Sequence, residues 1–261
     1  MVKSLSFVEV LTETAMQKAE AAKARSHPDP TATKPKAVIS DACAEIADRL
    51  KEDGFTFLKS GPRLKRIQGD VTHEIAFQSD HNNIAGRRAA VWIHAGVSSS
   101  RLGQWRRTHP NDWVRLEGPH AGRIVGAQIG NLTTPYGWME WDFADESKRE
   151  GLLDDAVAAI RRIILPFFAM FEDPSRSIEP LIQYDPLWQV SLLEYALAAL
   201  GTEAAETFGR SLLRRKPDVQ QHFEVAYAEF AKTAPPRARG QLGRDLAALA
   251  VATNLDLMGS D

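Results

Sequence analysis

Cysteine is nearly missing from this sequence, because Cys43 is the only one among 261 residues. One thiol can form neither an internal disulfide nor a thiolate metal cluster, which excludes a disulfide-stabilised scaffold and a zinc ribbon. Cys43 falls in the apolar stripe of a predicted helix, where a buried thiol packs as a small hydrophobic group and reacts poorly. We expect a protein of a reducing cytoplasm without a nucleophilic cysteine.

Long hydrophobic runs and an excess of one charge are also missing. The longest apolar-rich run, residues 163–171, is far shorter than the ~20 residues that cross a bilayer. Residues 1–24 lack the continuous apolar stretch of an export signal. The 32 Lys and Arg nearly balance the 34 Asp and Glu, and the basic residues are scattered. We expect no membrane insertion, no export and no nucleic-acid binding.

The common catalytic motifs are absent too. The sequence has no phosphate-binding glycine-lysine loop and no dinucleotide-binding glycine fingerprint. It has no nucleophile elbow, since Gly96-Val97-Ser98 lacks the required second glycine. We expect no cofactor and no bound metal ion. A chain of this length buries enough apolar surface to fold without either.

Residues 1–25 predict an N-terminal helix, because Ser6 and Glu9 form a capping box. Three prolines in residues 26–36 indicate a linker. The helix is amphipathic and so is a candidate for self-association into a homo-oligomer.

Residues 37–172 predict a domain of one helix, an antiparallel sheet and a covering helix. Apolar residues at helical spacing follow Pro35, and the period then changes to two. Alternation and turn residues indicate four consecutive strands, and residues 122–132 and 138–143 supply two more. A second capping box, Ser147 with Glu150, predicts the start of a helix that Pro166 ends.

Residues 173–261 predict a separate helical domain, with four apolar stripes separated by Gly201, Pro217 and a proline pair. The fold class is therefore α+β: a five- or six-stranded antiparallel sheet with covering helices, followed by a C-terminal all-α unit.

Part of this pattern resembles a group of bacterial domains of unknown function. The residues that carry the resemblance are Gly54-Phe55, Lys59, Arg66, Ile75-Ala76-Phe77-Gln78-Ser79, Val91-Trp92-Ile93 and Gly96-Val97. In that group a helix precedes an antiparallel sheet whose second hairpin carries a phenylalanine-glutamine pair. The resemblance covers a third to a half of the chain and implies a fold, with no catalytic residues to carry over.

Polar residues that could support catalysis gather on two predicted neighbouring strands and their turn: His73, Glu74, Asp80, His81 and His94. Imidazole and carboxylate groups bind metal ions and transfer protons. Alternation, however, places His73 and Glu74 on opposite faces of a strand, so these neighbours cannot converge on one ion. We interpret the histidines mainly as structural and keep His73, Glu74, His81 and His94 as catalytic candidates.

Tryptophan and arginine are concentrated in residues 105–141, where four of the six tryptophans lie. Both residue types anchor protein interfaces, because a rigid ring buries a large area and a guanidinium pairs with carboxylates. Packing at the sheet edge is the alternative interpretation of the tryptophans. The candidate binding residues are Trp105, Arg106, Arg107, Trp113, Trp138 and Trp141.

Two functions remain open. The first is a non-enzymatic interaction protein that presents residues 105–141 to another protein. Its more specific version is a protein of an immunity or defence system. The alternative is a metal-dependent hydrolase or nuclease-like enzyme that uses the histidines and carboxylates of the sheet.

Overall fold

The computed structural model describes residues 33–109, 120–173, 189–233 and 240–259. The expected N-terminal helix, residues 26–32 of the expected linker and Trp113 lie outside the described residues. The last two linker residues, 35 and 36, belong to a helix.

Helix α2 (Pro35–Arg49) opens the described chain, and proline at its first position pre-sets the helical φ angle. Its buried face includes Ile39, Cys43 and Ile46. The 3-10 turn η1 (Lys51–Asp53) follows and ends at Gly54, whose φ of 83° suits a residue without a side chain. The expected helical spacing is therefore confirmed.

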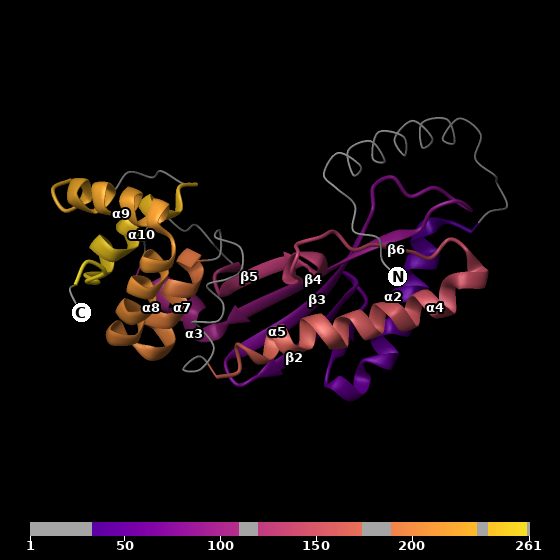
Figure 1. Ribbon diagram of the computed structural model, residues 1–261. Coiled ribbons are helices and arrows are strands. Elements are labelled where there is room, and N and C mark those ends of the chain that lie inside the picture. Colours follow the sequence, from indigo (N-terminus) through magenta and orange to yellow (C-terminus); the bar gives the residue numbers. More distant parts are fainter. Residues whose placement is uncertain (1–32, 110–119, 174–188, 234–239, 260–261) are drawn as a thin grey trace. The chain divides into compact units, whose positions relative to one another are not determined.

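A six-stranded antiparallel sheet follows (Figure 1). Five strands neighbour one another in chain order: β1 (Thr56–Leu58), β2 (Arg63–Gln68), β3 (Val71–Ser79), β4 (Ala90–Ser99) and β5 (Arg123–Gln128). β6 (Trp141–Asp142) pairs with the start of β4. Burial alternates along β3, so its apolar positions and His73 face the core. The predicted antiparallel sheet is confirmed.

The last two predicted strands are shorter than the sequence pattern indicates. β5 ends at Gln128 because the chain turns into the 3-10 helix η3 (Ile129–Leu132). The Gln128 side chain caps this turn by accepting a hydrogen bond from the Gly130 amide at 2.6 Å. Residues 133–140 form no strand, and only two residues pair as β6.

Helix α4 (Glu146–Ala159) begins two residues earlier than expected, and helical structure continues beyond Pro166. Asp145, not Ser147, caps it, because the Asp145 carboxylate accepts a hydrogen bond from the Ser147 amide. The chain passes through a π-helical turn η4 (Ile160–Ile164) into α5 (Leu165–Ala169), which contains Pro166. The wider π turn changes the hydrogen-bond pattern where proline lacks a donor.

The remaining described helices are α3 (Ser100–Thr108), α7 (Gln189–Leu200), α8 (Thr202–Arg215), α9 (Pro217–Phe230) and α10 (Leu242–Thr253). Ser99 caps α3 by accepting a hydrogen bond from the Leu102 amide. α3 contacts α7, α7 contacts α8 and α10, and α9 contacts α10. The C-terminal run of helices is confirmed.

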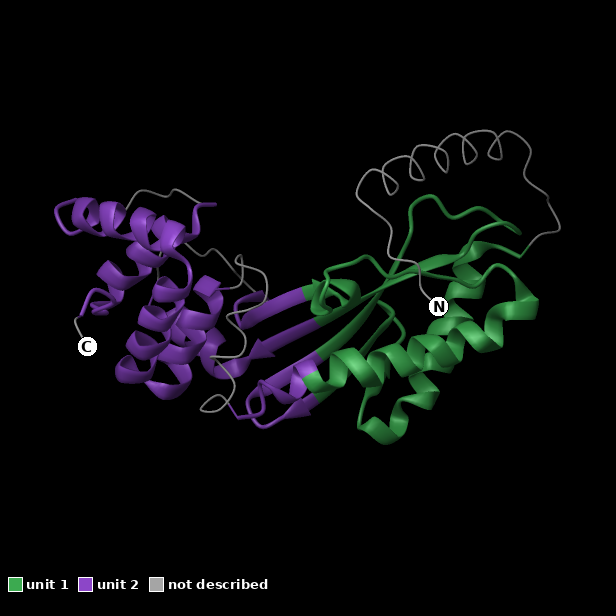
Figure 2. Ribbon diagram, viewed as in Figure 1, with its two compact units in different colours: residues 1–66, 74–95, 127–166 green, residues 67–73, 96–126, 167–261 purple. Residues whose placement is uncertain are grey.

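The described chain divides into two compact units (Figure 2). Unit 1 comprises residues 1–66, 74–95 and 127–166, and unit 2 comprises residues 67–73, 96–126 and 167–261. Unit 2 thus includes α3 and parts of four sheet strands, β2 to β5, together with the C-terminal helices, whereas the sequence predicts a division at residues 172–173. Within the described residues, no helix is long and apolar enough to cross a membrane.

Candidate functional site

The histidines of the predicted cluster have different surroundings. His73 is completely buried in unit 2, where its ring stacks on Phe168 with a centroid distance of 4.6 Å. Glu74 points to the other face of β3 and lies 3.7 Å from Arg63 in unit 1. The expected separation of these two neighbours is confirmed.

His94 is half-buried on β4 in unit 1. Burial lowers the pKa of its imidazole below the usual 6.5, because desolvation disfavours the charged form. Its Nε2 atom has no hydrogen-bond partner among the described residues. His94 is therefore suited to packing as a neutral ring.

Asp80 belongs to an ion-pair network at the tip of the β3–β4 hairpin. It is buried, which opposes ionisation, but hydrogen bonds from the Asn82 amide and the Arg88 guanidinium outweigh that effect and lower its pKa. Exposed His81 lies 3.3 Å from the same carboxylate. The hairpin is closed further by Asn83, whose side chain bonds both the amide and the carbonyl of Ala90. These contacts hold the loop between β3 and β4 in one conformation.

The described residues contain no group of three or more His, Cys, Asp or Glu that could hold a metal ion. The metal-dependent hydrolase or nuclease-like alternative therefore gains no support from this part of the chain.

Arg106 lies in the interior of unit 2 rather than on a binding surface. Its guanidinium is paired with Glu194, which it contacts through both Nε and Nη2. It also donates to the carbonyls of Ala121 and Arg123 at 2.9 and 2.8 Å. Burial raises the pKa of Glu194, and Arg106 opposes this shift. Because all its donors point inward, Arg106 holds α3 to α7 and to the start of β5.

Trp141 is also a core residue, because only 2% of it is exposed. Its Nε1 donates to the Asp155 carboxylate of α4 at 2.9 Å. On α3, Trp105 is half-buried and stacks on His109, whereas Arg107 is exposed. Sequence spacing cannot distinguish these positions, since both core and interface tryptophans are large and apolar.

Trp138, like Arg107, is a predicted binding residue that the structure places on the surface. It is 52% exposed, and Tyr136 is 62% exposed two positions earlier. The Trp138 ring packs edge-to-face against Trp92 of β4, with centroids 5.1 Å apart and an interplanar angle of 81°. Unit 1 therefore displays an edge-to-face pair of tryptophans, with exposed Tyr136 two positions before Trp138 in the chain.

This aromatic pair is joined to charged groups through Glu140. One oxygen of Glu140 accepts a hydrogen bond from Trp92 Nε1 at 2.9 Å, and the other accepts from Arg88 at 2.7 Å. We call the set formed by Arg88, Trp92, Tyr136, Trp138 and Glu140 the Trp138 surface.

The chain segment that carries the Trp138 surface is held by hydrogen bonds. The Gly137 amide donates to the Gly130 carbonyl at 3.0 Å, and the Thr133 hydroxyl donates to the same carbonyl at 2.7 Å. The Gln128 side chain donates to the Met139 carbonyl. Gly130 has no room for a side chain, since a Cβ atom there would collide with the backbone of Gly137. The exposed tryptophan is thus fixed in position.

Trp92, Arg88 and Glu140 were not among the candidate binding residues from the sequence. The alternation of β4 gave one usable signal, because Trp92 falls on the opposite face from buried Val91 and Ile93. Its partner Trp138 is 46 positions away in the chain, and a contact at that separation has no local signature.

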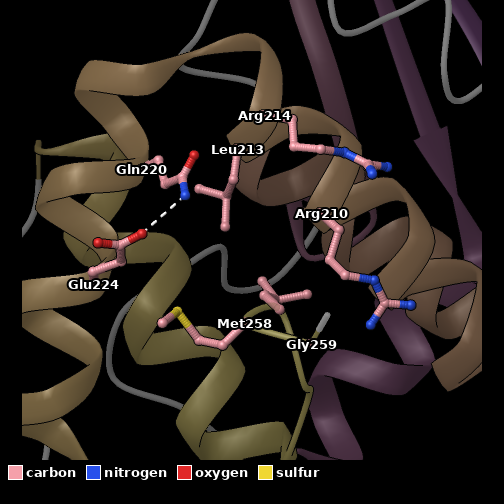
Figure 3. A pocket seen from close by; sticks show the side chains of 8 residues that line it. Arg210, Leu213, Arg214, Gln220, Glu224, Met258 and Gly259 are labelled. Atoms are coloured by element: carbon pink, nitrogen blue, oxygen red, sulfur yellow. Dashed lines mark hydrogen bonds between the residues drawn. The ribbon is translucent and has the colours of Figure 1, made fainter. Parts of the chain in front are cut away.

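A hollow of about 120 Å³ lies among the C-terminal helices of unit 2 (Figure 3). It is lined by Arg210, Leu213, Arg214, Gln220, Glu224, Leu257, Met258 and Gly259. Gln220 and Glu224 bond each other at 2.9 Å on one side. Arg210 donates to the Asp256 carbonyl and so ties the C-terminal segment to α8. These polar groups serve contacts within the unit.

Residues 46–170 match the profile of DUF4304, a domain of unknown function. The match runs from the last turn of α2 to the end of α5, so it contains the whole sheet and the Trp138 surface but not α7–α10. No curated protein and no solved structure matches the chain. The expected resemblance to an uncharacterised group of domains is confirmed.

Proposed function

We propose that this chain is a non-enzymatic binding protein that holds a partner protein against the Trp138 surface. The observation that carries the proposal is a half-exposed tryptophan held in place by the structure around it. Tryptophan dominates binding energy at many interfaces, and pre-ordering reduces the entropy lost on binding.

The composition of the surface supports this proposal. Interfaces are enriched in tryptophan, tyrosine and arginine and have a polar rim. The Trp138 surface combines two tryptophans, a tyrosine and the Arg88–Glu140 ion pair. On α3 of unit 2, Trp105 and Arg107 remain further candidate contacts, whereas Arg106 and Trp141 are used inside the protein.

The test is capture of a partner from host lysate by the full chain, compared between wild type and Trp138→Ala. We expect at least one specific protein to be captured by wild type and lost with Trp138→Ala, because hot-spot residues contribute about 2 kcal/mol or more, a ~30-fold change in affinity. Val225→Ala is the matched control, since Val225 is a 65% exposed apolar residue on α9.

Thermal unfolding of the same three proteins completes the experiment. Val225→Ala should change the unfolding free energy by no more than about 0.5 kcal/mol. Trp138→Ala also loses the edge-to-face contact with Trp92, so it should lower the unfolding free energy by about 0.5–1.5 kcal/mol and leave the chain folded. Capture that is equal in wild type and Trp138→Ala would refute the proposed surface.

We further propose a location in the bacterial cytoplasm, supported by the single cysteine, which is buried and unpaired. We also propose that this protein serves an immunity or defence system. Identification of the Trp138-dependent partner by mass spectrometry tests that role, and cell fractionation tests the location.

A further inference from the structure

The charges beside the Trp138 surface are unbalanced. Arg88 lies 2.9 Å from Asp80, 2.7 Å from Glu140 and 3.9 Å from Asp142. One guanidinium faces three carboxylates, and His81, 3.3 Å from Asp80, adds positive charge only when it is protonated. With a neutral His81, two negative charges are in excess. Asp80 stays ionised, because its hydrogen bonds lower its pKa. The surface next to Trp92 and Trp138 is therefore electronegative.

The aromatic rings add to this attraction for positive charge. The face of an indole ring carries negative electrostatic potential, and a guanidinium or ammonium group gains free energy by lying over it. Trp92 is held by Glu140 through its indole N–H, while half of Trp138 remains uncovered. An uncovered indole beside excess carboxylate is a combination that selects a cationic, partly apolar side chain.

We propose, building on the function proposed above, that the segment bound at the Trp138 surface is basic and that an arginine side chain of the partner stacks on Trp138. Its charge is stabilised by Glu140 and Asp142. Arginine fits better than lysine, because a planar guanidinium stacks on an aromatic ring and bonds a carboxylate at the same time. An acidic segment or a nucleic-acid phosphate would instead meet like charge.

The direct test uses defined peptides with the full chain. The probes are acetyl-Gly-Arg-Gly-Arg-Gly-amide, the same peptide with glutamine in place of arginine, and the same peptide with glutamate. The indole N–H signals of Trp92 and Trp138 in NMR report binding at the surface. We expect saturable shifts with the arginine peptide alone, and weaker binding as salt is raised.

Three variants separate charge from plain apolar contact. Trp138→Leu keeps an apolar side chain but removes the ring, and we expect it to weaken arginine-peptide binding between about 2-fold and about 30-fold, the range of a cation–π contact. Glu140→Gln should also weaken it, whereas Trp138→Phe should retain part of the affinity. Val225→Ala should bind as wild type does. Unfolding curves for each variant identify any loss of folding.

The outcomes also separate this inference from the proposed function. Equal shifts with the glutamine peptide, or unchanged arginine binding in Trp138→Leu, would overturn the basic-partner inference. If the lysate partner still depends on Trp138 in that case, the proposed function stands and only its charge preference is wrong. If neither the peptide nor any lysate protein depends on Trp138, both are refuted.

Discussion

Arg106 and Arg107 are neighbours on α3, yet their charges have opposite surroundings. The Arg106 side chain is 5% exposed and paired with a fully buried Glu194, while Arg107 faces solvent. The attraction within a buried pair only offsets the cost of removing two ions from water. The pair therefore contributes little beyond what apolar residues could, but its disruption is costly.

The effect of breaking this pair can be measured. We predict that Arg106→Ala lowers the free energy of unfolding by about 3–5 kcal/mol, because Glu194 is left buried without its counter-charge. Arg107→Ala on the same helix should change it by no more than about 0.5 kcal/mol. Urea unfolding of the two variants makes the comparison, and a small effect in both would show that solvent reaches Glu194.

His94 makes the stability of unit 1 depend on pH. Its folded-state pKa is below 6.5, so the unfolded chain binds a proton more readily than the folded chain does. We predict that stability is full above the ordinary pKa and falls as pH decreases below about 6.5. His94→Gln should flatten this part of the curve in urea unfolding between about pH 8 and about pH 5.

The carboxylates affect stability in a lower pH range than His94 does. The pKa of Asp80 is lowered from 3.8 in the folded state, so its contribution is present above that value and is lost as pH falls below it. A decline in stability that begins only below about pH 4 in wild type would assign the acid sensitivity to carboxylates and not to His94.

At the scale of elements, two helical glycines differ in the space around them. Gly243 in α10 lies against α9, and a Cβ atom there would be 2.6 Å from the Val219 carbonyl oxygen. Gly151 in α4 has open space around it. The same substitution should therefore have opposite effects at the two positions.

We predict that Gly243→Ala destabilises the protein by about 1–3 kcal/mol, because backbone of a neighbouring helix must move. Gly151→Ala should stabilise it by up to about 1 kcal/mol through better helix propensity. Thermal unfolding of both variants is sufficient, and stabilisation by Gly243→Ala would show that α9 and α10 can separate at little cost.

Local patterns predicted the elements well where one periodicity dominated. The alternation of Val71, Ile75 and Phe77 indicated β3, and apolar spacing indicated the helices. The predicted helix start was wrong where two nearby side chains can both cap a helix, since Asp145 and not Ser147 caps α4. The predicted helix end at Pro166 was wrong too, because the sequence does not show that a π turn precedes it.

The candidate site was less predictable than the fold for a physical reason. Trp138 and Trp141 are three positions apart and chemically identical, yet one is half exposed and the other buried. The difference comes from partners distant in sequence, Trp92 for the first and Asp155 for the second. Composition suggested a binding surface, but only tertiary contacts separate its members from the core.

At the scale of the whole molecule, the domain match and the folded unit have different limits. The match ends at residue 170, whereas Arg106, which lies inside it, is paired with Glu194 outside it. Arg101 of α3 likewise donates to the Ala199 carbonyl. The helices after the match therefore complete part of its interior.

We predict that a chain ending at residue 172 is much less stable than the full chain. It would lose the Arg106–Glu194 ion pair and would uncover the apolar surface that α7 buries. Circular dichroism and binding of a hydrophobic dye to both chains measure this. A shortened chain that unfolds cooperatively at the same temperature would show that the sheet region folds independently.

The hairpin tip between β3 and β4 determines how the protein responds to proteases. Arg87 and Arg88 offer trypsin two adjacent cleavage sites in a solvent-facing loop, the usual place for proteolytic nicking. Cleavage needs the loop to open locally, and Asp80 with Asn83 closes it from both sides. Brief trypsin treatment should therefore leave the peptide bonds after Arg87 and Arg88 intact, and the first cuts should fall elsewhere in the chain.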